Sequence, residues 1–126
     1  MAAVWFLRFG VVFAVVGMGL GIAMGASHDF TLAPVHAHIN LVGWVSMFLA
    51  GLFYHTHPRA EGFWSRLHLF VAVPAMLVLV TGIYGAQTNA AWGVPVAIAG
   101  SLAVIIAMIL FAGIVFAFTG KRLTQA

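Results

Sequence analysis

The sequence predicts an all-α integral membrane protein with four transmembrane helices in one domain, residues 1–126. Two observations carry this prediction. The chain has 64% hydrophobic residues and only 6% charged residues, whereas a soluble domain carries about 25% charged residues. The hydrophobic residues also gather into four long runs. Because so few charged side chains cannot cover a surface in water, most of the protein surface must face the lipid bilayer. The length suits a single domain.

Each hydrophobic run is long enough to cross the hydrocarbon core of a bilayer, which takes about 20 helical residues. Backbone N–H and C=O groups find no partner in lipid, so each span must satisfy them internally as a helix. The predicted spans are Ala3–Met24, Pro34–Tyr54, Leu67–Gly85 and Trp92–Thr119.

Basic residues mark three places between and beyond these spans. Arg8 lies near the N-terminus, Arg59 and Arg66 lie in the second connection, and Lys121 and Arg122 lie in the tail. The first and third connections have no basic residue. The positive-inside rule then places both termini and the second connection in the cytoplasm. Cations this dispersed form no phosphate-binding patch, so we expect no nucleic-acid partner.

Histidine is the outlier among the polar residues, with six copies against two acidic residues and no cysteine. Without cysteine the chain has no disulfide, no thiolate metal site and no covalent haem attachment. Ionisable residues inside a membrane are usually functional. By depth, the outer group is His28, His36 and His38, and the inner group is His55, His57 and His68. About 28 Å of helix separates the two groups, so no single metal ion reaches both.

His36 and His38 are the strongest candidate ligands. Two positions apart on a helix, they face nearly opposite directions and suit two different neighbours. Asn40 and Gly43 follow His36 by four and seven positions, so an α-helix puts them on its face. Glycine there leaves room for a flat ring such as haem, whose iron accepts a histidine nitrogen. Trp44 would line the edge of that ring or pack against a helix.

Residues 36–59 resemble a histidine-bearing helix of subunit I of the haem–copper oxidases, most closely the C-family, cbb-type enzymes. The likeness covers about a fifth of the chain. It rests on a His-x-His pair followed by Gly-Trp, Met, Gly, Tyr and Pro-Arg at the family's spacing. The matching residues are His36, His38, Gly43, Trp44, Met47, Gly51, Tyr54, Pro58 and Arg59. In that family the first histidine ligates the high-spin haem and the second ligates the low-spin haem.

The resemblance implies a haem b (iron) membrane cytochrome of a bacterial inner membrane. It would transfer electrons, with quinol or a small redox protein as partner, or bind a diatomic gas such as oxygen or nitric oxide. The chain is like one four-helix repeat of subunit I, so a homotrimer could imitate the whole subunit. Each haem would then lie between His36 of one protomer and His38 of the next. No adjacent His-His pair is present, so we expect no copper site.

Two other functions fit the same residues. His55, His57 and His68 could form a cytoplasmic-side metal site for copper or zinc, since imidazole suits both ions. Alternatively, the chain is a cofactor-free accessory or assembly subunit. Its first helix has glycines at four-residue spacing from Gly17 to Gly25, and such glycines let a partner helix approach closely.

Overall fold

The computed structural model describes residues 1–120, so Lys121 and Arg122 lie outside the described residues. Within residues 1–120 the chain forms four helices that are long and apolar enough to cross a membrane. This confirms the predicted number of spans, and each helix begins and ends within a few residues of the prediction. The spans are Ala2–Ser27, Ala33–Thr56, Phe63–Gln87 and Gly93–Thr119.

The second span is not one regular helix. An α-helix changes into a π-helix close to its start and returns to an α-helix for its second half, and a short 3₁₀ turn follows it. In chain order the elements are α1 (Ala2–Ser27), α2 (Ala33–His38), the π-helix η1 (Ile39–Val45), α3 (Ser46–Thr56), η2 (Pro58–Ala60), α4 (Phe63–Gln87) and α5 (Gly93–Thr119).

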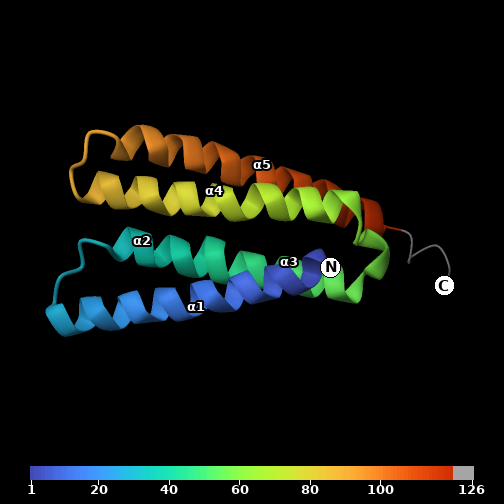
Figure 1. The fold of residues 1–126 in the computed structure, drawn as a ribbon, viewed down its shortest axis with the longest axis horizontal. Helices are drawn as coiled ribbons and strands as arrows, with labels where there is room; N and C mark the ends of the chain where they lie inside the picture. The colour runs from blue at the N-terminus through green and yellow to red at the C-terminus, as the bar shows by residue number, and fades with distance from the viewer. Residues whose placement is uncertain (121–126) are drawn as a thin grey trace.

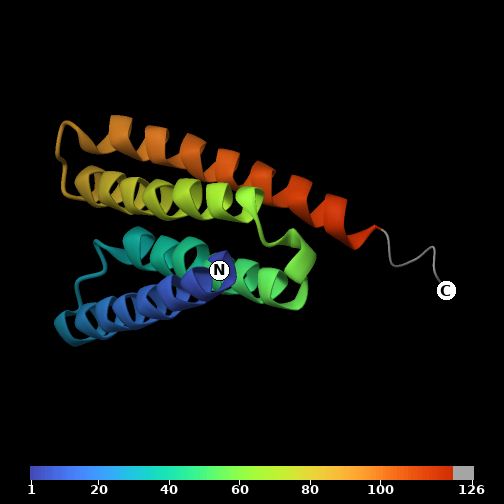
Figure 2. The same ribbon diagram turned by 45° about the vertical axis from the view of Figure 1, so that its right-hand side comes forward.

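The helices form two antiparallel hairpins, α1 with α2–α3 and α4 with α5 (Figure 1). The hairpins meet where α1, α2 and the π-helix touch α4. The loops 28–32 and 88–92 lie at one end of the molecule, which we call the hairpin end (Figures 1 and 2). Met1, the loop 57–62 and the last turn of α5 lie toward the other end, the terminal end (Figure 1). Histidines from the start and the finish of the second span therefore lie at opposite ends.

Helices α4 and α5 pack with their backbones in contact. A Cβ atom placed on Gly82 would collide with the backbone of Ala97, and one placed on Gly100 would collide with the backbone of Leu79. Small residues at such positions let two membrane helices approach closely enough for extensive van der Waals contact. Gly82 and Gly100 thus hold the second hairpin together.

Large apolar side chains cover the outside of the molecule as well as its core. The interior holds Phe6, Tyr54 and Met76, each no more than 1% exposed. The outer surface of α5 carries exposed large apolar side chains from Val94 to Phe116, and the other helices expose similar side chains. Such a surface is stable only against lipid or further apolar helices, in agreement with a multi-pass membrane protein.

Helix α1 begins at a carboxylate that the loop 57–62 supplies. Glu61 accepts hydrogen bonds from the amides of Ala2 and Ala3, at 3.0 and 2.7 Å, and from the terminal ammonium of Met1 at 2.9 Å. The first N–H groups of a helix have no partner inside it, and they favour a negative charge. Partial burial alone would raise the pKa of Glu61, but these hydrogen bonds outweigh burial and hold the pKa below its usual value.

Replacing Glu61 with alanine is expected to lower the free energy of unfolding by about 1 kcal/mol, as for other lost helix caps. The folded-state pKa lies below the unfolded one, so the contribution of Glu61 is fully present above the usual glutamate pKa. It is lost as the pH falls through the lower folded-state value. Denaturation in detergent micelles at neutral and acidic pH measures this, with Glu61→Gln separating charge from shape. A penalty that stays the same in acid would contradict the pH dependence.

Candidate functional site

Two histidines lie at the hairpin end, where α2 passes into the π-helix. His36 Nδ1 lies 2.8 Å from the carbonyl oxygen of Gly17 on α1, and His38 Nδ1 lies 2.8 Å from the carbonyl oxygen of Pro34. A carbonyl oxygen only accepts hydrogen bonds, so in this arrangement each Nδ1 carries the proton and donates. The Nε2 atom of each ring is then the basic nitrogen, which is the form that binds metals.

Asn40 and the glycines of α1 hold His36 in place. The Asn40 amide donates to the backbone carbonyl of His36 at 2.9 Å. It also lies 3.3 Å from His36 Nδ1, but that nitrogen already donates to Gly17, so the shorter contact is the hydrogen bond. A Cβ on Gly17 would meet the Asn40 amide at 2.6 Å, and one on Gly21 would meet the His36 ring at 2.8 Å. The space beside Gly17 and Gly21 is thus filled by side chains of the second span, whereas Gly25 has nothing within 4 Å of an added Cβ.

The π-helix Ile39–Val45 begins directly after His38. Its wider turn shows in the backbone N–H of Ser46, which donates to the Leu41 carbonyl, five residues earlier. Short π segments inside α-helices are rare and occur frequently at functional sites. The segment changes which residues after His38 share a face.

Gly43 and Trp44 belong to this π-helix. The regular helical period of 3.6 residues puts Gly43 on the same face as His36, with space for a flat ligand. In the structure Gly43 is buried, and a Cβ on it would meet Met76 Cε at 2.8 Å and Phe13 Cγ at 2.9 Å. The space beside Gly43 therefore holds side chains of α1 and α4. Trp44 is half-buried, and its carbonyl oxygen lies against Gly10 of α1.

The three histidines of the terminal end do not come together. His55 is exposed. His57 Nδ1 lies 3.0 Å from the Phe53 carbonyl oxygen, and its ring stacks on the Phe53 ring with the centroids 4.4 Å apart. His68 is buried in the interior. Within the described part of the chain, no group of three metal-ligating side chains is placed to hold an ion, so the geometry lends no support to an inner copper or zinc site.

His68 instead pairs with Tyr54 inside the protein. The Tyr54 hydroxyl lies 3.0 Å from His68 Nδ1, and the two residues are 0% and 4% exposed. The His68 ring lies 4.7 Å from the ring of Phe6 and stacks on Phe111 at 5.0 Å, centroid to centroid. Sequence patterns alone do not reveal this pair. The available signal is that Tyr54 lies three residues before the loop 57–62 and His68 six residues after it, so both are within two helical turns of that loop.

The hairpin end thus presents two partly exposed imidazoles, each with one nitrogen bonded to a backbone carbonyl. The terminal end presents the exposed His55, the partly exposed His57 with the same kind of carbonyl contact, and the buried His68, whose hydrogen bond goes to a tyrosine. His36 and His38 differ from these in lying two residues apart, directly before the π-helix. Comparison of the chain with protein-family models, with curated proteins and with solved structures gives no match.

Proposed function

We propose that this chain is a haem b membrane cytochrome whose iron ligands are His36 and His38. The observation that carries the proposal is the 2.8 Å contact between a backbone carbonyl oxygen and Nδ1 of each histidine. Such a hydrogen bond fixes the tautomer and the orientation of a ligand imidazole. Haem iron accepts neutral imidazole nitrogen, so the donor set fits the cofactor.

One chain does not offer both rings to one iron. The His36 ring forms a hydrogen bond to the Gly17 carbonyl of α1, whereas the His38 ring forms one to the Pro34 carbonyl of its own helix. We therefore propose a homotrimer in which His36 of one protomer and His38 of the next share a haem. The large apolar side chains on the outside of every span provide surface for such an assembly. In the mechanism the Gly17 carbonyl orients His36 and the Pro34 carbonyl orients His38.

When bound, a haem with two imidazole ligands supplies one-electron transfer, here to or from quinol or a small redox protein, and a haem with one ligand binds oxygen or nitric oxide. The protein's part in either case is to hold the imidazoles in a fixed orientation. Asn40 contributes by tying the backbone at His36. The short π-helix that follows begins directly after His38.

The proposed location is a bacterial inner membrane with the terminal end facing the cytoplasm. Three arginines lie in the half of the molecule nearer the terminal end. They are Arg8 in α1, Arg59 in the loop 57–62 and Arg66 in the first turn of α4. The positive-inside rule favours the cytoplasm for that end. Since the chain has no cysteine, single cysteines placed at 30 and at 59, labelled with an impermeant thiol reagent in intact cells, distinguish the two orientations.

The test of haem binding is the optical spectrum of detergent-purified protein, oxidised and then reduced with dithionite. We expect a sharp reduced α-band, lost in His36→Ala and in His38→Ala because each removes a ligand. A reduced spectrum that changes with carbon monoxide would assign an open coordination site and gas binding. A protein that stays colourless after haem is supplied would overturn the proposal.

The matched control is His55→Ala, which removes an exposed histidine at the other end of the same span and should leave the spectrum unchanged. Haem content and mass together test the trimer. One haem per protomer in a trimeric particle agrees with sharing between neighbours. The same haem content in a monodisperse monomer contradicts it.

A further inference from the structure

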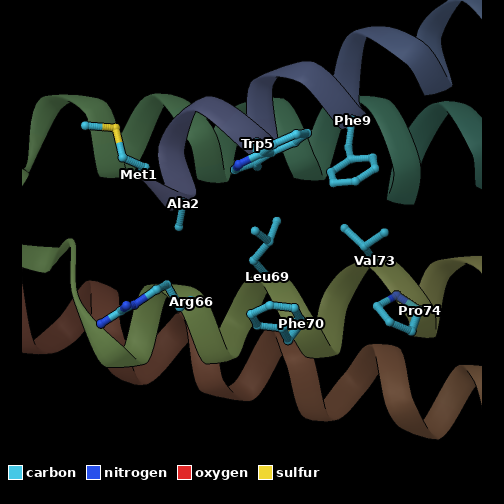
Figure 3. Close-up of a pocket in the computed structure, with 9 residues that line it drawn as sticks. All are labelled: Met1, Ala2, Trp5, Phe9, Arg66, Leu69, Phe70, Val73 and Pro74. Atoms are coloured by element: carbon cyan, nitrogen blue, oxygen red, sulfur yellow. The ribbon is translucent and has the colours of Figure 1, made fainter.

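An apolar groove runs between α1 and α4 and opens to the outside of the molecule. We call it the α1–α4 groove. It has a volume of about 460 Å³, within the roughly 300–1,000 Å³ of pockets that take small molecules. Trp5 and Phe9 line it from α1 (Figure 3). The α4 side carries Leu69, Phe70 and Val73, with Arg66 at the terminal end (Figure 3).

The length of the groove matches the depth of one leaflet of the bilayer. Its lining runs from Met1 to Phe9 on α1, which spans about 12 Å at 1.5 Å per residue. One leaflet of the hydrocarbon core is roughly 15 Å deep. An acyl chain lying along the membrane normal fits this space.

The charge at the terminal end of the groove is positive. Arg66 lines that end, and its Nε donates to the Gly62 carbonyl at 3.1 Å, which restrains the guanidinium group. The guanidinium carbon of Arg8 lies 5.2 Å from the ring centroid of Trp5, so a second cation stands beside the lining. The chain has two acidic residues. Asp29 is at the hairpin end, and Glu61 already accepts three hydrogen bonds at the start of α1.

We infer that the α1–α4 groove binds one anionic phospholipid from the leaflet at the terminal end. One acyl chain lies against Phe9, Leu69 and Val73, and the phosphate accepts hydrogen bonds from Arg66. An arginine fork matches phosphate oxygens and donates two parallel hydrogen bonds. Basic pockets between membrane helices take anionic headgroups elsewhere for the same reason. This inference is independent of haem.

The experiment is a titration of delipidated protein in detergent, followed by native mass spectrometry. The probes are phosphatidylglycerol and phosphatidylcholine with identical acyl chains. We expect one phosphatidylglycerol to bind more tightly than phosphatidylcholine. Arg66→Gln should weaken the binding of phosphatidylglycerol about fivefold, the usual effect of one basic side chain near an anionic surface. It should leave the binding of phosphatidylcholine unchanged.

Two further variants separate the groove from general surface charge. Arg59→Gln removes an exposed arginine that does not line the groove and should not change either affinity. Val73→Trp fills the groove and should weaken the binding of both lipids. If Val73→Trp fails to fold, Arg66→Gln still tests the inference. Equal binding of the two lipids, equal effects of the two arginine variants, or a lipid-free dimer held through the groove would each overturn the inference.

Discussion

Replacing Gly100 with alanine is expected to lower the free energy of unfolding by about 2 kcal/mol, the middle of the range for overpacked sites. The reason is geometric. A Cβ atom at Gly100 would collide with backbone atoms of Leu79 on α4. Backbone atoms cannot rotate away as a side chain can, so α4 and α5 must separate along their length and lose van der Waals contact.

Gly113 supplies the matched control, because it lies on the same helix with nothing within 4 Å of an added Cβ. Alanine favours a helix over glycine by up to about 1 kcal/mol, so Gly113→Ala should leave stability unchanged or slightly raised. Gly82→Ala, which meets the backbone of Ala97 from the other side, should resemble Gly100→Ala. Unfolding by sodium dodecyl sulfate in mixed micelles measures all three. Equal stability of the variants at 100 and 113 would contradict backbone contact between the helices.

The four spans were predictable because one large contribution decides them, the free energy of placing apolar side chains in lipid. Burying about 20 apolar residues in lipid outweighs local propensity, and helix ends follow from where polar residues begin. Even Pro74, inside the third span, does not interrupt α4. The placement of His36 near one end of a span and His55 near the other follows from helix length alone.

The π-helix was not predictable, because the interpretation of Asn40 and Gly43 assumed the regular period of 3.6 residues. A π segment inserts an extra residue, and no composition rule marks where one begins. Asn40 still contacts His36. Gly43, seven positions on, lies against Phe13 and Met76 instead. A face assigned by periodicity thus holds for one turn and then drifts.

Contacts between distant residues were also beyond reach from the sequence. Glu61 caps a helix that begins 59 residues earlier. Gly100 contacts Leu79 across a hairpin, although the glycines that stand out as a motif are those of α1. Such pairings depend on how the hairpins are rotated about their axes. That rotation is set by the packing of all side chains together.

Replacing His68 with alanine is expected to lower the free energy of unfolding by about 3 kcal/mol, as for other large-to-small changes in a core. The ring fills the space between Phe6 and Phe111, so its loss leaves a cavity. It also leaves the buried Tyr54 hydroxyl without its partner. Tyr54→Phe should cost about 1 kcal/mol. A double-mutant cycle isolates the hydrogen bond, which averages about 0.6 kcal/mol between membrane helices.

The same variants separate the two kinds of histidine in this chain. His68 is covered on both ring faces and bonded to a hydroxyl, which assigns it to the stability of the fold. His36 is partly exposed and bonded to a carbonyl, which suits it to hold a ligand. If the proposed haem is bound, His68→Ala should therefore lower stability and keep the spectrum, whereas His36→Ala should lose the spectrum and keep most of the stability. A folded His68→Ala protein without the spectrum would make His68 part of the binding site and contradict this division.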